Sequence, residues 1–487
     1  MIVEDNIEPN TRSAYDQAKA VLAELDNSPL SRFHWKAMIT SGMGFFTDAY
    51  DLFIIGVALA ILTPLWHLSN FEVGLVGSTS LLAAALGSYV FGWLADRIGR
   101  HAIYGTTLVV LAIGALLSAL SPNIVWLLAF RFILGLGIGG DYPLSATLMS
   151  EYANRRDRGK LITMVFSMQG LGLIIGPLVA LALLLSGLNH DLVWRLMLAL
   201  GAVPALATFY LRRQIAETPR FALTMHGDVE AASKTIAMVT SNNRTKKTAS
   251  NGTKKAAQKK QPKKSWSYLL LTPRYLRWII GTAGTWFLLD IAYYGTTISS
   301  PLVLKSLNPH SSLVPNMLYT LLIFAVAALP GYVLSAFTID RLGRKWIQCV
   351  GFGMMALAYA LLAIFPAFTT MVVPFLLLYG MSYFFTEFGP NVTTFVYPAE
   401  VFPVMVRSTA HGIAAALGKV GAFLGALLFP YLLSTFHLPG AMALAAVVSA
   451  LGLLLTLLTL PETNQRSLEE ISDEHTVMAE HKETIPA

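Results

Sequence analysis

The chain has 487 residues, of which 55% are hydrophobic and only 13% are charged. Soluble domains carry about 25% charged residues, so this composition excludes an array of soluble domains and favours a protein with many membrane spans. The single cysteine, Cys349, excludes a disulfide framework and a cysteine-ligated metal site.

Residues 1–36 precede the first long apolar run and are predicted to form a cytoplasmic segment. Within it, apolar residues recur at helical spacing from Ala14 to Leu25, which indicates a short amphipathic helix on the membrane surface. Six apolar runs follow and predict an N-terminal six-helix bundle over 37–211. The predicted spans are 37–62, 72–94, 103–121, 124–146, 161–185 and 193–211.

Residues 212–273 are rich in lysine, mixed with Ser, Thr, Asn and Gln, and are predicted to be a solvated, disordered cytoplasmic linker. The clustered lysines are Lys246, Lys247, Lys254, Lys255, Lys259, Lys260, Lys263 and Lys264. No aromatic residues are interleaved with them for stacking on bases, so the net charge of +7 does not indicate a nucleic-acid partner. Anionic lipid headgroups are the predicted partner of this linker.

A second set of six apolar runs predicts a C-terminal six-helix bundle over 274–460, followed by an acid-rich cytoplasmic tail over 461–487. The predicted spans are 275–299, 314–338, 346–365, 370–395, 408–432 and 438–460. Basic residues gather in the loops of one side, which places both termini in the cytoplasm by the positive-inside rule.

Two polar patterns recur at matching places in the two halves. An Asp–Arg loop follows the second span of each half, and a Glu–Arg pair follows the fourth. These residues are Asp96, Arg100, Glu151 and Arg158 in the first half and Asp340, Arg344, Glu400 and Arg407 in the second. The repetition predicts a duplicated six-span unit, with carboxylate–arginine pairs that latch one state of a rocking transporter.

The loop from Gly92 to Arg100 is similar to the most diagnostic motif of the major facilitator superfamily. The resemblance extends over residues 30–470. It implies an all-α membrane protein with twelve transmembrane helices in two pseudo-symmetric bundles, a midplane site and alternating access. It also matches Arg131 to a motif arginine of the superfamily, for which we expect a role in charge balance.

Ionisable residues inside predicted spans are costly and indicate function. They are Asp48, Asp51, Arg131, Asp141, Asp290, Glu387 and Lys419. Asp48 and Asp290 occupy equivalent positions on the first helix of each half, so we expect both to face one central cavity. Buried carboxyl groups can load and unload protons near neutral pH, which is the chemistry of proton-coupled transport.

The seventh span carries Trp286, Asp290 and Tyr294 at helical spacing, and Gln169 and Asn391 add amide groups in other spans. We find no phosphate-binding loop of the type G-x-x-x-x-G-K-[ST], so secondary transport is favoured over an ATP-driven pump. No enzyme, cofactor or metal site is predicted, because no serine–histidine constellation or metal-ligand cluster falls in a plausible cavity.

The segment GGDYPLSAT, from Gly139 to Thr147, resembles the signature of the phosphate:proton symporter family of this superfamily. The segments WFLLDIAYYG from Trp286, FGPN from Phe388 and the pair Gly418-Lys419 are similar to further motifs of that family. The resemblance implies a plasma-membrane symporter that imports inorganic phosphate with protons. It implies a phosphate pocket of Tyr142, Gln169, Trp286, Asp290, Tyr294 and Asn391, proton-pathway roles for Asp48, Asp51 and Asp141, and charge balance by Lys419.

The residues themselves are compatible with this ligand. Dihydrogen phosphate is an anion that still carries O–H groups, so Tyr, Trp and amide donors can satisfy its oxygens. An ionised Asp290 can accept a phosphate O–H and would repel sulfate, which has no proton to donate. Glu387 has no assigned role.

Three alternatives stay open. The spacing of Asp48 and Asp51 resembles the D-x-x-D pattern of organic-anion (aromatic-acid) symporters, although the usual glycine is missing. Glu217-Thr218-Pro219-Arg220 resembles a sugar-porter motif, although the seventh span lacks the paired glutamines of sugar porters. A non-transporting nutrient receptor would use the long linker for signalling.

Overall fold

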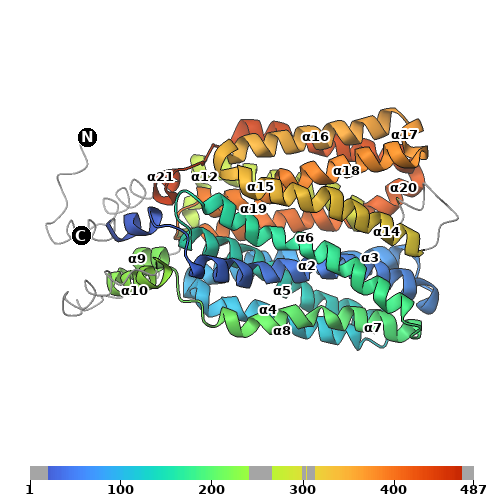
Figure 1. Cartoon of the computed structure of the whole chain (residues 1–487), viewed down its shortest axis with the longest axis horizontal. Coiled ribbons are helices and arrows are strands. Elements are labelled where there is room, and N and C mark those ends of the chain that lie inside the picture. Colours follow the sequence, from blue (N-terminus) through green and yellow to red (C-terminus); the bar gives the residue numbers. More distant parts are fainter. Residues whose placement is uncertain (1–19, 241–265, 299–302, 304–312, 474–487) are drawn as a thin grey trace.

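The computed structural model describes residues 20–240, 266–298, 303 and 313–473, and none of these residues lies in a β-strand. Long helices run side by side along one axis of the molecule (Figure 1). The helices of the first half are α2 (Arg32–Trp66), α3 (Asn70–Ile98), α4 (Arg100–Ala119), α5 (Ile124–Tyr152), α6 (Arg158–Leu185), α7 (His190–Leu200) and α8 (Ala202–Arg212). Helices α7 and α8 meet at Gly201 and together form the sixth predicted span.

The second half repeats this arrangement with more interruptions. Its elements are α12 (Pro273–Ile298), α14 (Leu313–Ile323), a π-helical turn η2 (Phe324–Ala328), α15 (Leu329–Leu342), α16 (Arg344–Ile364), α17 (Ala367–Thr370), α18 (Val372–Phe388), α19 (Pro390–Val401) and α20 (Arg407–Thr459). Gly389 separates α18 from α19 and is followed by Pro390, whose ring cannot continue the preceding helix. Broken helices of this kind place free backbone groups next to transport sites.

The predicted twelve spans are present. Ten helices of the described chain are long and apolar enough to cross a membrane, which makes the protein a multi-pass membrane protein. Helix α20 is one of these ten, yet its 53 residues contain two predicted spans, and the chain leaves helical geometry at His437 (φ 57°, ψ −176°). Helix α12 adds a further crossing of 26 residues, about 39 Å at 1.5 Å per residue.

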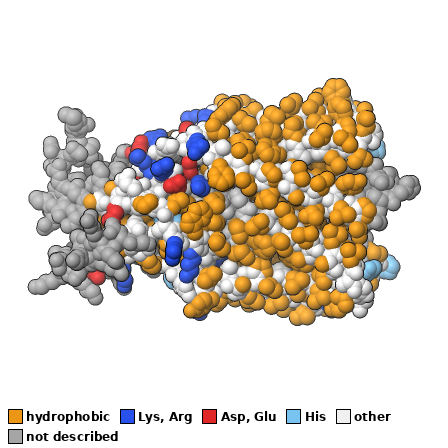
Figure 2. Space-filling view, viewed as in Figure 1, with side chains coloured by type: hydrophobic (Ala, Val, Ile, Leu, Met, Phe, Trp, Pro, Cys, Tyr) orange, Lys and Arg blue, Asp and Glu red, His pale blue; other side chains and the backbone are white. Residues whose placement is uncertain are grey.

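The surface of the bundle separates into an apolar band and a charged end. Hydrophobic side chains cover the long helices, whereas Lys, Arg, Asp and Glu gather at one end (Figure 2). That end also carries the short elements α9 (Pro219–His226), α10 (Val229–Thr240), η1 (Trp266–Leu271) and α21 (Leu468–Ser472) (Figure 1). We call it the polar end.

The prediction of a disordered linker over 212–273 is wrong for residues 219–240, which form α9 and α10. Thr218 caps α9 by accepting a hydrogen bond from the Phe221 N–H, and Gly227 ends the helix at φ 62°. Phe221 and Ile236 are buried, so packing against the rest of the protein stabilises these two helices. The polar composition of the segment gives no sign of this packing. The clustered lysines from Lys246 to Lys264 lie outside the described residues.

The predicted amphipathic helix near the N-terminus is described only over residues 20–26. Its placement on the membrane surface is wrong for this part. Leu25 is fully buried, and Val21 and Leu22 pack against Ala222 and Leu223 of α9. Protein, rather than lipid, therefore covers the apolar face of this helix.

Small residues allow the helices around the centre to approach closely. A Cβ atom at Gly421 or Gly425 of α20 would overlap the carbonyl oxygens of Phe287 and Ile291 on α12. Gly92 of α3 and Gly412 of α20 face one another in the same way across the two halves. Close packing of small residues is what holds helices together where no hydrophobic effect acts between them.

We expect Gly421→Ala to destabilise the protein by about 1–3 kcal/mol, because the added methyl group must displace the backbone of α12. The melting temperature of the purified protein in detergent, followed by intrinsic fluorescence, measures this effect. Gly353→Ala is the matched control, since its Cβ would meet only Leu453 at 3.9 Å. Equal melting temperatures for the two variants would contradict the close approach of α12 and α20.

Candidate functional site

The six residues of the predicted pocket come from four different segments and meet at the centre of the bundle. Each is at most 3% exposed. Helix α5 contributes Tyr142, α6 contributes Gln169, α12 contributes Trp286, Asp290 and Tyr294, and α19 contributes Asn391. The following contacts link all six into one cluster between the two halves.

Asp48 anchors the part of the cluster that belongs to the first half. Its Oδ2 atom accepts hydrogen bonds from the Tyr142 hydroxyl at 2.6 Å and from Gln169 Nε2 at 3.3 Å. Gln169 Nε2 also lies 3.3 Å from the Tyr142 hydroxyl oxygen. Asp48 is 5% exposed near the middle of α2, and it has no Lys, Arg or His within ion-pair distance among the described residues.

Lys419 of α20 lies between the two halves. Its Nζ atom is 3.7 Å from Asp290 Oδ2 and donates a hydrogen bond to the Tyr294 hydroxyl. The same ammonium lies 4.3 Å from the centre of the Tyr142 ring, a cation–π distance. The Trp286 ring is 5.8 Å from the Tyr142 ring. Lys419 therefore contacts Asp290 of its own half directly and the ring of Tyr142, whose hydroxyl binds Asp48 of the other half. That Asp48 and Asp290 face one central cavity stays a prediction.

Tyr332 of α15 joins Gln169 to Asn391 across the interface. Its hydroxyl donates to Gln169 Oε1 at 3.0 Å and accepts from Asn391 Nδ2 at 2.9 Å. Asn391 Nδ2 also donates to Glu387 Oε2 at 2.5 Å. Sequence reasoning missed Tyr332, because a search for charges inside spans does not detect an uncharged hydroxyl. The adjacent Gly331 packs closely against α18.

Two further carboxylates of the predicted proton pathway form buried ion pairs. Arg131 binds Asp51 through two hydrogen bonds of 3.0 and 2.9 Å and also donates to Ser80 at 2.9 Å. Asp141 forms a similar bidentate pair with Arg212, whose Nη2 lies 2.9 Å from Asp141 Oδ2. Arg212 was not identified from the sequence, because residue 212 falls in the predicted linker and not in a predicted membrane span.

A small cavity adjoins these groups. It is lined by Asp48, Asp51, Ser80 and Arg131 together with apolar side chains of α2, α3 and α5. An apolar layer lies one helical turn from the cluster towards the polar end, where the Phe166 and Phe395 rings stack at 4.6 Å and Phe45 contacts Phe395 at 5.0 Å. These rings come from both halves and separate the cluster from the polar end.

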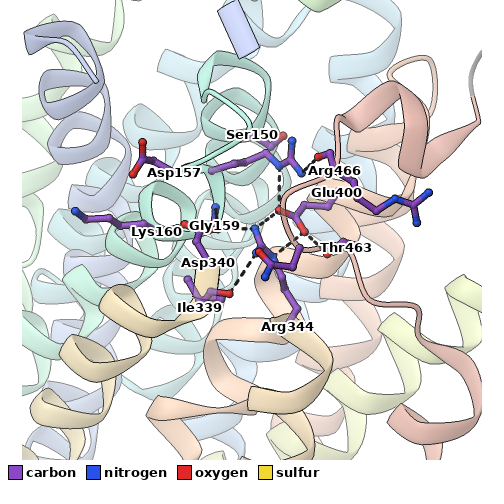
Figure 3. A network of polar contacts seen from close by, with 12 residues as sticks. Ser150, Asp157, Gly159, Lys160, Ile339, Asp340, Arg344, Glu400, Thr463 and Arg466 are labelled. Atoms are coloured by element: carbon purple, nitrogen blue, oxygen red, sulfur yellow. Dashed lines mark hydrogen bonds and ion pairs between the residues drawn. The ribbon is translucent and has the colours of Figure 1, made fainter. Parts of the chain in front are cut away.

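The predicted carboxylate–arginine pairs meet at the polar end. Glu400 accepts hydrogen bonds from Arg344 of its own half at 2.8 Å and from Arg158 of the other half at 3.0 Å (Figure 3). Thr463, beyond α20, donates to its second oxygen at 2.5 Å. Asp340 lies 2.9 Å from Arg344 and accepts from two backbone N–H groups in the first turn of α6, at 3.0 and 2.6 Å.

The equivalent residues repeat this network on the other side of the interface. Glu151 accepts from Arg100 of its own half at 3.2 Å and from Arg407 of the other half at 3.1 Å, and Thr218 donates to it at 2.5 Å. Asp96 accepts from two backbone N–H groups in the first turn of α20, at 3.2 and 2.6 Å. Each predicted latch residue therefore contacts the opposite half directly or through a shared partner.

An additional ion-pair cluster ties the segments around the bundle together. The buried Arg220 of α9 pairs with Asp26 at 2.5 Å and with Glu469 of α21. Burial, the largest single effect, raises the pKa of the Glu469 carboxyl, but the charge of Arg220 and the hydrogen bonds to the carboxylate together outweigh burial, so the net shift of this pKa is downward. The described N-terminal helix, α9 and α21 are thus joined at one arginine.

Comparisons with known proteins give a consistent result. A family model described as "Sugar (and other) transporter" matches residues 14–475. The chain is similar to "Probable inorganic phosphate transporter 1-6" of Arabidopsis thaliana, with 37% identity over 511 residues that cover 95% of this chain and 98% of the relative. It is also 37% identical to "Inorganic phosphate transporter 1-11" of Oryza sativa subsp. japonica, over 93% of this chain and 90% of that protein.

Among solved structures, the proton:xylose symporter XylE bound to 6-bromo-6-deoxy-D-glucose has a TM-score of 0.78 to this chain at 21% identity. The match covers 92% of this chain and 100% of that chain, and it shows that the two proteins share the major facilitator fold. The family model and the relatives extend over almost the whole sequence. The chain therefore belongs to the sugar (and other) transporter family of the major facilitator superfamily, together with the plant inorganic phosphate transporters.

Proposed function

We propose that this protein is a symporter that moves inorganic phosphate and protons together by alternating access. The observation that carries the proposal is the buried cluster around Lys419, in which hydroxyl, indole and amide groups of both halves surround one cation. The names of relatives that are 35–38% identical over most of the chain support phosphate as the substrate.

The chemistry of the cluster suits dihydrogen phosphate. Lys419 offsets the charge of the anion, while the hydroxyls of Tyr142 and Tyr294 and the indole N–H of Trp286 can donate to its oxygens. Asp290, only 3.7 Å from Lys419, can accept a phosphate O–H. Sulfate carries no such proton at neutral pH, so Asp290 would face it with an uncompensated charge.

Of the three predicted proton-pathway residues, Asp48 is the strongest candidate for proton exchange. Asp51 and Asp141 each accept two hydrogen bonds from an arginine, and these pairs would have to open before either carboxylate could take a proton. Asp48 has only the neutral donors Tyr142 and Gln169 as hydrogen-bond partners. Because no Lys, Arg or His of the described residues lies within ion-pair distance of Asp48, this buried carboxylate can exchange a proton without first breaking an ion pair.

We infer that the polar end faces the cytoplasm of a cell whose plasma membrane holds the protein, and that the latches close this end. Support comes from the basic side chains at that end and from the two networks centred on Glu151 and Glu400 (Figure 3). Opening the end towards the cytoplasm requires both networks to separate. Binding of anionic lipids by the lysine-rich part of the linker stays a prediction on residues outside those described.

The decisive experiment is uptake of radiolabelled phosphate into proteoliposomes under an imposed pH gradient, in competition with unlabelled sulfate, benzoate and glucose. Uptake that needs the gradient and resists all three competitors is expected. No phosphate uptake by demonstrably reconstituted protein that takes up labelled benzoate or glucose would favour the aromatic-acid or sugar alternative.

Asp290→Asn should abolish phosphate uptake, because the variant loses the negatively charged acceptor next to Lys419. The measurement is initial uptake in proteoliposomes at equal protein content. Asp191→Asn is the matched control, since Asp191 forms an exposed pair with Arg195 at 3.0 Å in α7. Normal transport by Asp290→Asn would remove Asp290 from the pocket.

Asp48→Asn should weaken the dependence of uptake on the pH gradient while preserving exchange of internal for external phosphate. The amide can still accept from Tyr142 but cannot carry a proton. Uptake is measured at several imposed gradients and compared with exchange at equal pH on both sides. An unchanged proton dependence would exclude Asp48 from the pathway.

The double variant Glu151→Gln/Glu400→Gln should open the polar end, because each buried glutamate holds arginines of both halves and loss of one partner of such a pair costs about 3–5 kcal/mol. Spin labels at Arg97→Cys and Arg341→Cys, in a Cys349→Ser background, report the separation of the two loops by electron paramagnetic resonance.

The labelled distance should increase in the double variant and stay unchanged in Glu470→Gln, whose partner Arg466 is exposed. A distance distribution identical to that of the parent protein would contradict the latch.

A further inference from the structure

The buried acids of the membrane helices divide into two groups. Eight aspartates and glutamates between α2 and α20 are buried: Asp48, Asp51, Asp96, Asp141, Glu151, Asp290, Glu387 and Glu400. Six of these lie within 4 Å of an arginine or lysine. In the described part of the chain, only Asp48 and Glu387 have no basic partner at that distance.

These two unpaired carboxyl groups are the ends of one hydrogen-bonded chain. From Glu387 Oε2 the chain passes through the Asn391 amide (2.5 Å), the Tyr332 hydroxyl (2.9 Å) and the Gln169 amide (3.0 Å), and it ends at Asp48 Oδ2 (3.3 Å). Asp48 and Gln169 belong to the first half, whereas the other three residues belong to the second. The chain therefore crosses the interface at the level of the proposed phosphate site.

Among the described residues, no Lys, Arg or His lies within ion-pair distance of Glu387. Asn391 of α19, Tyr332 of α15 and Tyr293 of α12 provide hydroxyl or amide groups, and the charge of the acid Asp290 acts on Glu387 from α12. The carboxyl group is 0% exposed, and its Oε1 atom has no hydrogen bond that satisfies normal geometry. An ionised carboxylate is costly in such a place, so a proton on Glu387 removes an uncompensated buried charge.

We propose that Glu387 is a second proton-carrying group of the transport site, so that each half of the protein carries one proton per phosphate. This inference rests on the proposed phosphate:proton symport and deepens it. A proton from the outside solution forms an O–H bond on the Glu387 carboxylate, and after the halves rock the same bond breaks to release the proton to the inner solution. Asp48 does the same in the first half.

The hydrogen-bonded chain between Glu387 and Asp48 gives a reason for both protons to be coupled to the rocking of the two halves. Tyr332 donates to Gln169 of the opposite half, so rocking of the halves must break the chain at this contact. Asn391 and Gln169 are also residues of the predicted phosphate pocket. Binding of the anion and separation of the halves therefore change the hydrogen-bond partners of both carboxyl groups at once.

The test is the proton-to-phosphate ratio of the full-length protein in proteoliposomes, with the membrane potential clamped. At each imposed pH gradient, the phosphate gradient that gives zero net flux is measured. The slope of the logarithm of the phosphate ratio against the pH difference is the number of protons per phosphate. We expect Glu387→Gln to lower this slope by one, and Glu387→Asp to restore it.

Glu72→Gln is the matched control, because Glu72 caps α3 at an exposed position and should keep the wild-type slope. A wild-type slope in Glu387→Gln would overturn the proposal, as would a slope of zero in Asp48→Asn.

Infrared difference spectroscopy separates this proposal from the proposed function. Wild-type protein without phosphate should show a protonated-carboxyl band that titrates with pH and is missing or shifted in Glu387→Asp and Glu387→Gln. Absence of phosphate transport by wild-type protein would refute the proposed function, while the titrating band would still support Glu387 as a proton carrier. Identical spectra of wild-type and both variants would overturn that role.

Discussion

The need to compensate charge inside a membrane-embedded bundle organises this protein. A carboxylate in the interior requires a counter-ion or a proton, because the surrounding side chains and lipid tails cannot solvate it. At the polar end this requirement joins the halves, since Glu151 and Glu400 each bind one arginine of their own half and one of the other. The same charges that would be prohibitively costly alone therefore define how the two bundles meet.

Duplication of the six-helix unit explains why these contacts come in matched sets. Asp96 accepts from the first turn of α20 and Asp340 from the first turn of α6, so each half caps a helix of the other. An acid at the positive end of a helix is stabilised by the helix dipole as well as by its hydrogen bonds. In the proposed rocking movement, both sets would separate together.

At the centre of the bundle, the need for a counter-ion or a proton divides the buried acids into two kinds. Asp51 and Asp141 each bind an arginine of the first half, whereas Asp48 and Glu387 lie at the two ends of an uncharged hydrogen-bonded chain. Lys419 and Asp290 lie beside this chain, close enough to one another for an anion to compete for the lysine. A site built in this way couples the charge of the ligand to the protonation of its surroundings.

The sequence by itself determined the spans and the repeat and predicted most of the side chains that meet at the centre, because apolar periodicity, basic loops and rare charges in spans are local patterns. It predicted disorder for residues 219–240 and a surface-bound helix near Leu25, since burial of these segments depends on partners distant in the chain. Only the tertiary structure showed that Arg212 pairs with Asp141, that Tyr332 bridges the halves and that no basic side chain of the described residues lies within ion-pair distance of Glu387. Such pairings arise from the packing of helices far apart in sequence, and no spacing within one helix encodes them.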